Sequence, residues 1–284
     1  MAAVGLLIVL ISVLGGFALE GGNLGVLIQP AELVIIGGAA VGSVVISAPG
    51  SSRSAIGHAF KHGFGNHTPT KQDYIDLFSL LFELFQLMRR EGTLAVEDHV
   101  TAQGETPLFQ KYPGVKAKKQ GFEMLLDGLK QMVDGLPPQE LDQLFEIELE
   151  THHAEEHEPV NLIRTAGDSL PGLGIVAAVL GIVITMGHMS DGPEAIGHSV
   201  GAALVGTFLG ILLCYGFIGP LATNIELQGA AETRYLNCIR GALVAAARGR
   251  NPYVAIDVGR RSLYKAERPT MAELEAAFTA LKGK

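Results

Sequence analysis

The sequence predicts an all-α membrane protein: four transmembrane helices, a helical cytoplasmic domain between the second and third, and a cytoplasmic C-terminal tail. Four apolar runs, residues 1–20, 31–49, 168–188 and 197–222, meet or approach the about 20 residues that a helix needs to cross a bilayer. All 21 Lys and Arg residues lie in two blocks outside these runs, within residues 50–164 and 221–284. The 48% hydrophobic content is therefore concentrated in the four runs.

The charge distribution also predicts the orientation. Lys and Arg beside spans are retained in the cytoplasm, so we expect both termini on the cytoplasmic side of a bacterial inner membrane. The short external loops, residues 20–30 and 188–196, contain no Lys or Arg. The first run lacks a basic start and a good cleavage site, which argues against a signal peptide. We expect the spans to carry no titrating carboxylate of their own, so an ion path between them would need one from elsewhere.

The block at residues 50–165 has helical rather than strand periodicity. Apolar residues recur at helical spacing from Tyr74 to Met88, and Gly92 provides a C-terminal stop. Two further helices are expected at residues 121–133 and 139–150. We infer a compact helical lobe in the cytoplasm.

The remaining block, residues 223–284, is predicted as a cytoplasmic extension and tail. Residues 224–247 contain no Pro and continue the fourth span as a helix. Residues 251–268 are expected to be loop or short extended segments. Thr270 and Glu273 form a capping box that begins a last helix.

Small residues line the last two spans. Gly206 and Gly210 form a G-x-x-x-G pair, and Gly174, Ala178 and Gly181 form a stripe. Small residues let helix backbones approach closely, which favours a packed bundle or an oligomer.

Two prolines lie at the ends of these spans. Pro171 is expected to open the third span, after a cap at Asp168 or Ser169. Pro220 lies where a helix continues, so it must remove a hydrogen bond and kink that helix.

The embedded polar side chains are few, and each has a structural alternative. A Thr hydroxyl usually bonds its own helix, but it could instead orient water or bond a carboxylate. The candidates are Thr185, Thr207, Cys214 and Tyr215.

Other site classes have little support. His153 and His157, in the segment 152–157, share a helix face, but the segment lacks H-E-x-x-H and is predicted to be a solvated linker. His188 and His198 are expected at the outer interface. The net charge of −8 and the lack of nucleotide-binding motifs argue against nucleic-acid or nucleotide partners. Cys214 and Cys238 are not expected to pair.

Four strings together resemble one family. They are QPAELVIIGGAAVGS (29–43), AGDSLPGLGIVAAVLG (166–181), VGTFLGILLCYGFIGPLA (205–222) and GRRSLYKAERPT (259–270). They are similar to the MotA family of flagellar stator subunits, within the MotA/TolQ/ExbB proton-channel superfamily. The resemblance implies a non-enzymatic ion channel that generates torque for flagellar rotation, in motility and chemotaxis, without a cofactor or metal.

The resemblance also implies partners. Five MotA-type subunits surround a dimer of MotB, whose single transmembrane helix supplies the channel aspartate. The homopentamer would sit in membrane lipid and act on the rotor protein FliG.

Site residues carry over by position. Pro171 and Pro220 match the family's coupling prolines, and Thr207 and Tyr215 match polar positions of the fourth span. Sodium-driven relatives commonly have a hydroxyl residue where this chain has Ala178. A methyl group cannot coordinate a hard cation, so we expect the transported ion to be H⁺ rather than Na⁺.

The resemblance further implies a rotor-binding pair. Arg89 and Glu97 match an Arg and a Glu that meet charged groups of FliG. The chain departs from that pattern by adding Arg90 and Asp98, so either Arg89 or Arg90 could make the contact.

Two alternatives remain open at this point. An ExbB/TolQ-type subunit would energise an outer-membrane process, but that group usually has three spans and an external N-terminus. A membrane hydrolase using His153 and His157 would need a metal motif that the sequence lacks.

Overall fold

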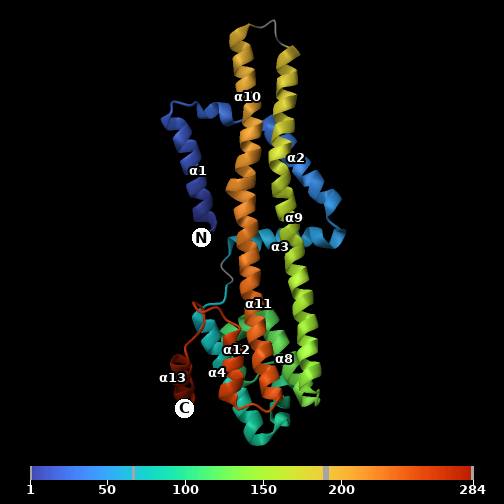
Figure 1. The fold of residues 1–284 in the computed structure, drawn as a ribbon, viewed down its shortest axis with the longest axis vertical. Coiled ribbons are helices and arrows are strands. Elements are labelled where there is room, and N and C mark those ends of the chain that lie inside the picture. Colours follow the sequence, from blue (N-terminus) through green and yellow to red (C-terminus); the bar gives the residue numbers. More distant parts are fainter. Residues whose placement is uncertain (1, 66–67, 188–191, 283–284) are drawn as a thin grey trace. The chain divides into compact units, whose positions relative to one another are not determined.

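The computed structural model describes residues 2–65, 68–187 and 192–282, and within these ranges it contains helices and no strands (Figure 1). Four helical stretches are long and apolar enough to cross a membrane: Ala2–Leu19, Leu24–Ser47, Pro138–Gly187 and Pro193–Ala247. The prediction of a four-span helical protein is confirmed. The outer-loop residues 188–191, including His188, lie outside the described residues.

The chain divides into two compact units. Unit 1 comprises Met1–His67 and Glu155–Gln228, and unit 2 comprises Thr68–Ala154 and Gly229–Lys284. Two long helices, α9 and α11, contribute residues to both.

Unit 1 contains the apolar segments. Its elements are α1 (Ala2–Leu19), the 3₁₀ turn η1 (Leu24–Leu27), α2 (Pro30–Ser47), α3 (Gly50–Phe64), the C-terminal part of α9 (Pro138–Gly187), α10 (Pro193–Ile211), the π-helix η4 (Leu212–Ile218) and the start of α11 (Gly219–Ala247). The helix α3 was not predicted. It is tied to α11 by a hydrogen bond from the Asn224 side-chain amide to the Gly63 carbonyl, at 2.7 Å.

The expectation that the spans carry no carboxylate is wrong. Glu32 lies in the first turn of α2, two residues after Pro30, and its side chain is buried. A short acidic side chain at the start of an apolar run is easily read as part of the preceding loop. The contacts made by this carboxylate are considered in the last part of the Results.

Three segments predicted to be separate form one helix. The helix at 139–150, the supposed linker containing His153 and His157, and the third span are all part of α9, with Pro159 and Pro171 in its interior. The linker was expected because the segment is strongly polar. Polarity alone does not end a helix, however.

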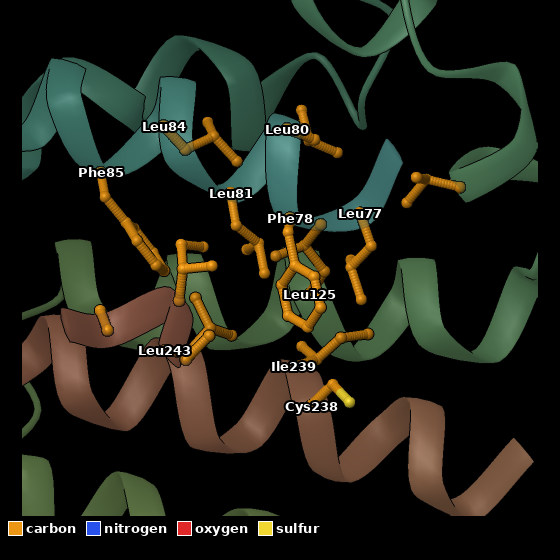
Figure 2. Close-up of a cluster of buried hydrophobic side chains, with 14 of the residues drawn as sticks. Leu77, Phe78, Leu80, Leu81, Leu84, Phe85, Leu125, Cys238, Ile239 and Leu243 are labelled. Atoms are coloured by element: carbon orange, nitrogen blue, oxygen red, sulfur yellow. The ribbon is translucent and has the colours of Figure 1, made fainter. Parts of the chain in front are cut away.

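Unit 2 is organised around α4 (Lys71–Glu91). The helix begins with a capping box of Thr70 and Asp73 and ends at Gly92, whose φ of 90° suits glycine. Figure 2 shows its apolar face pointing toward α8 (Lys119–Val133) and α11. The buried side chains there include Leu77, Phe78, Leu81, Phe85, Leu125, Ile239 and Leu243.

Short helices complete this side of unit 2. They are η2 (Thr93–Val96), α5 (Glu97–Thr101), α6 (Pro107–Gln110) and α7 (Pro113–Ala117). Tyr112, just before α7, donates a hydrogen bond of 2.7 Å to Glu83 of α4. Burial and this carboxylate raise the pKa of Tyr112, so the phenol stays neutral and keeps donating.

The tail is more regular than predicted. The region 251–268 contains α12 (Pro252–Arg261), which starts at the side-chain cap of Asn251 on the Tyr253 amide, 3.0 Å away. An N-cap followed directly by Pro was the missed helix-start signal. The Arg260 side chain donates to both the Asp257 carboxylate and the Pro269 carbonyl, and the Arg268 side chain donates to the Leu263 carbonyl. These bonds hold the segment after α12 close to the end of that helix.

The last helix, α13 (Met271–Lys282), begins at the predicted capping box. The Glu273 carboxylate accepts a bond of 2.7 Å from the Thr270 amide, and its other oxygen accepts one of 2.7 Å from Lys71. The bonds from Lys71 and Thr270 lower the pKa of Glu273 to about 2. The contact with Lys71 joins α13 to the start of α4.

Candidate functional site

The central feature of unit 1 is a close contact between the backbones of α9 and α10, which run side by side (Figure 1). A Cβ at Gly174 would lie 2.7 Å from the Gly206 carbonyl oxygen, and one at Gly210 would overlap the Leu170 carbonyl oxygen. A Cβ at Gly181 would lie 2.7 Å from the Cβ of Ala203. We call this contact the glycine seam. The predicted close approach of these small residues is confirmed.

Pro171 lies at the inner end of the seam, inside α9 rather than at its start. Ser169, a predicted cap, instead donates to the Ala166 carbonyl of its own helix at 2.7 Å. Because proline has no N–H, the Gly167 carbonyl receives no helical bond from it. Gly167 in turn packs closely on Ile218, since a Cβ there would lie 2.8 Å from the Ile218 side chain.

Pro220 follows a π-helix. The Gly219 amide bonds the Cys214 carbonyl five residues earlier, and the residues Leu212–Ile218 form this wider turn. A π-turn shifts the hydrogen-bond register and is common at functional sites. This π-turn lies just before Pro220, which has no backbone N–H to donate. The helix continues beyond it as α11. Sequence reasoning anticipated a perturbation at Pro220 but not the wider turn before it.

Tyr215 and Pro220 share a second location. Both line a hollow of about 270 Å³ whose other wall is α1, with Ala2, Leu6 and Val9 among its residues. Tyr215 is 71% exposed, whereas its neighbour Cys214 is 3% exposed. The Tyr215 side chain thus points away from the buried side of the π-helix.

Ala178 and Thr207 lie at the seam. Ala178 is buried on α9 one turn from Gly174, and the Cα of Thr207 would lie 3.3 Å from a Cβ at Gly174. The Thr185 hydroxyl donates to the Gly181 carbonyl at 2.8 Å, as expected of an ordinary helical Thr. Unit 1 therefore brings Ala178, Thr207 and the Pro171 turn to one seam, but places Tyr215 and Pro220 at the α1 hollow.

The candidate rotor residues are on unit 2, at adjacent element ends. Arg89 and Arg90 end α4 and Glu97 begins α5, and all three are exposed. In the described part of the chain, none of the three forms an ion pair. Arg89 also lines a hollow of about 540 Å³ together with Arg250, from the turn after α11. Sequence reasoning missed Arg250, because only folding brings it beside Arg89.

The histidine segment is helical. His152 is buried and its Nδ1 lies 2.6 Å from the Gln120 amide nitrogen, whereas His153 is exposed. Within the described residues, no group of three or more His, Cys, Asp or Glu side chains could hold a metal ion.

Comparison with known proteins gives the family. Residues 3–92 match the family model "Motility protein A N-terminal", and residues 116–236 match "MotA/TolQ/ExbB proton channel family". The chain is 37% identical to Motility protein A of Salmonella typhimurium, over 98% of this chain and 95% of that protein. The chain belongs to the motility protein A family.

Other members and solved structures agree. Motility protein A of Escherichia coli is 38% identical over 98% of this chain and 95% of its own, and the chemotaxis protein LafT of Vibrio parahaemolyticus is 34% identical over 98% of each. The flagellar MotAB stator complex from Bacillus subtilis matches with a TM-score of 0.77 at 25% identity, over 98% of this chain and 99% of that chain. A C. jejuni MotAB chain has the same fold, with a TM-score of 0.81 at 22% identity, covering 95% and 98%.

The seam makes a testable prediction for this motility protein A. Gly210→Ala should weaken the α9–α10 contact by about 1–3 kcal/mol, because the new methyl group would overlap the Leu170 carbonyl. The amount of folded protein extracted from membranes and its thermal stability would be compared with wild type. Gly201→Ala, on the same helix with open space at its Cβ, is the matched control. Equal stability of the two variants would contradict the assigned contact.

Proposed function

We propose that this chain is the ion-channel and torque-generating stator subunit of a bacterial flagellar motor. It couples proton flow, through a complex with a MotB-type partner, to rotation of the rotor. The observation that carries this proposal is the match to motility protein A sequences over nearly the whole chain, including both the membrane segments and unit 2. The two similar solved chains come from MotAB complexes, which supports a MotB-type partner here.

The alternative of an ExbB/TolQ-type subunit is disfavoured. The family model over residues 116–236 covers that whole superfamily and does not separate the two. The match of residues 3–92 to the motility protein A N-terminal region favours a motility protein A over an ExbB/TolQ-type subunit. This matched region includes two of the four candidate spans. An ExbB/TolQ-type subunit usually has three spans.

The mechanism follows from the energetics of a carboxylate in a low-dielectric site. Protonating the partner's aspartate beside the third and fourth spans changes its interaction energy by several kcal/mol, because the charged form is poorly solvated there. One charge moving through ~100 mV yields about 2.3 kcal/mol. Each ion can therefore bias one step of the ring without covalent chemistry. The chain would act without enzymatic activity or a bound cofactor.

Further parts of the proposal concern assembly and placement. We assign the chain to the inner membrane with both termini and unit 2 in the cytoplasm, since all Lys and Arg lie within residues 50–164 and 221–284, on one side of the four spans. Five copies would surround two MotB-type partners in the lipid bilayer. Unit 2 would contact a FliG-type rotor protein through Arg89 or Arg90 and Glu97, which are exposed and unpaired in the described part of the chain.

The proposed ion is H⁺. The Ala178 side chain supplies no oxygen at the seam, and a dehydrated Na⁺ requires oxygen ligands. Tethered cells should keep rotating when sodium is withdrawn at constant proton-motive force. Rotation that stops under these conditions would identify a sodium-driven motor instead.

A deletion tests the function itself. Cells lacking the gene should assemble normal filaments yet be paralysed, and wild-type protein should restore rotation of tethered cells. Pro171→Leu, present in membranes at wild-type levels, should not restore rotation. It returns an N–H to the helix at the inner end of the seam and so changes the local backbone there. Normal swimming of a deletion strain that has no second stator would contradict the stator function and favour the ExbB/TolQ-type alternative.

The rotor surface makes a separate prediction. Arg89→Glu should lower the torque at high load by reversing one charge at the interface, while membrane levels and recovery with the MotB-type partner stay normal. Lys130→Glu, an exposed charge reversal on α8, is the control and should leave torque unchanged. If Arg90→Glu lowers torque and Arg89→Glu does not, the contact belongs to Arg90. Loss of the Arg89 variant from the membrane would indicate a folding role.

A further inference from the structure

Unit 1 contains a carboxylate that the mechanism above does not use. The Glu32 side chain is 7% exposed, and its Oε2 accepts no hydrogen bond from the described part of the chain. Ionisable side chains within a span are costly to bury and usually mark an ion path. A carboxylate with one buried, unpartnered oxygen is therefore a candidate for binding something that the folded chain alone does not provide.

The surroundings of Glu32 place it at the glycine seam. A Cβ at Gly206 of α10 would lie 3.0 Å from the Glu32 Cδ and would overlap its Oε2. A Cβ at Gly181 of α9 would lie 3.7 Å from its Oε1. At Gly206 the carboxyl group thus occupies space that only glycine leaves open, and near Gly181 it makes an ordinary van der Waals contact. From α2 it therefore reaches both α9 and α10.

This position is level with the proposed ion path. Gly206 directly precedes Thr207, and Gly181 lies one turn from Ala178 on α9. The carboxylate oxygens of Glu32 are therefore close to the proposed path positions Thr207 and Ala178. The Ala178 side chain has no oxygen. In the proposed topology, the start of α2 follows the outer loop, so Glu32 is also on the side from which ions enter.

Within the residues that the structure describes, the packed elements place no cation beside this carboxylate. In the described parts of α2 and η1, Glu32 is the one charged side chain. On α10, Glu194 and His198 are 12 and 8 residues from Gly206, or about 18 and 12 Å along a helix. On α9, Asp168 is 13 residues from Gly181, or about 20 Å. The Thr185 hydroxyl already donates to Gly181. A structural ion pair therefore does not explain the burial.

We propose that Glu32 is a proton-binding carboxylate on the ion path of this subunit. An entering proton forms an O–H bond at Oε2 and makes the group neutral. Release toward the partner's aspartate breaks the same bond and restores the carboxylate. This inference rests on the proposed stator function and adds a titrating group supplied by the subunit itself.

Substitution separates a proton-binding role from a packing role. Glu32→Gln keeps the shape and hydrogen-bonding capacity but cannot take up and release a proton. The complex with its MotB-type partner should still assemble, while proton flux in proteoliposomes falls by about 100-fold or more, as for loss of a proton-transfer group. Glu32→Asp keeps the titrating group and should retain more flux. Glu194→Gln, an exposed carboxylate in the first turn of α10, is the control and should match wild type.

Two results would overturn the proposal. Wild-type flux in Glu32→Gln, with Glu32→Ala failing to assemble, would leave Glu32 a packing residue. Flux driven by a sodium gradient alone, and abolished in Glu32→Gln, would make it a sodium ligand. Paralysis of the deletion strain with normal rotation of Glu32→Gln would reject this inference while leaving the stator function intact.

A second measurement uses the wild-type complex, in case Glu32→Gln does not assemble. Dicyclohexylcarbodiimide reacts with protonated carboxyl groups in apolar surroundings. Mass spectrometry should find it on Glu32, with labelling that declines as the pH rises over about pH 5–9, the range in which buried carboxyl groups titrate. Absence of labelling on Glu32 throughout this range would overturn the proposal.

Discussion

The close backbone contact between α9 and α10 is the constraint on which the rest of unit 1 depends. Gly174, Gly206 and Gly210 remove the side chains that would hold the two helices apart, so carbonyl oxygens and Cα atoms meet directly. In a membrane, helices gain little from the hydrophobic effect, and close packing of small residues is a main source of association. Gly206 also leaves the space into which the Glu32 carboxyl group fits.

The breaks in helical hydrogen bonding lie beside this contact. Pro171 follows Leu170, whose carbonyl meets Gly210, and Pro220 follows the π-helix that begins directly after α10. Proline and π-turns lower the cost of changing a helix locally, because fewer backbone bonds must be broken. Both α9 and α11 continue from these points into unit 2. Both helices therefore link the seam covalently to the lobe that holds the candidate rotor residues.

Unit 2 has the features expected of a rigid support for a charged surface. Its core joins α4, α8 and α11 through fully buried side chains, and α12 and α13 pack on α4 from the tail (Figure 2). Arg89, Arg90 and Glu97 extend from helix ends around Gly92, so their positions follow from the packing of α4. Their charges are exposed and contribute little to stability. Packing thus sets where these side chains lie, whereas stability does not account for their charges, which the proposed rotor contact would use.

The sequence by itself determined the helical fold, the four spans, the first helix of unit 2 with its Gly92 stop, and the capping box at Thr270. Each of these depends on local patterns: apolar length, helical periodicity and short-range capping. The residues at the seam and at the end of α4 were named in advance, because the family resemblance supplied the roles that we propose for them.

Tertiary structure decided the rest. The polar segment around His153 is helix because the helices on both sides continue through it, and no local signal distinguishes that outcome from a solvated linker. The neighbours Arg89 and Arg250, far apart in sequence, are brought together only by folding. Glu32 could be assigned a place only once α2, α9 and α10 were packed, because its carboxyl group fits beside Gly206, which lies about 170 residues away in the chain.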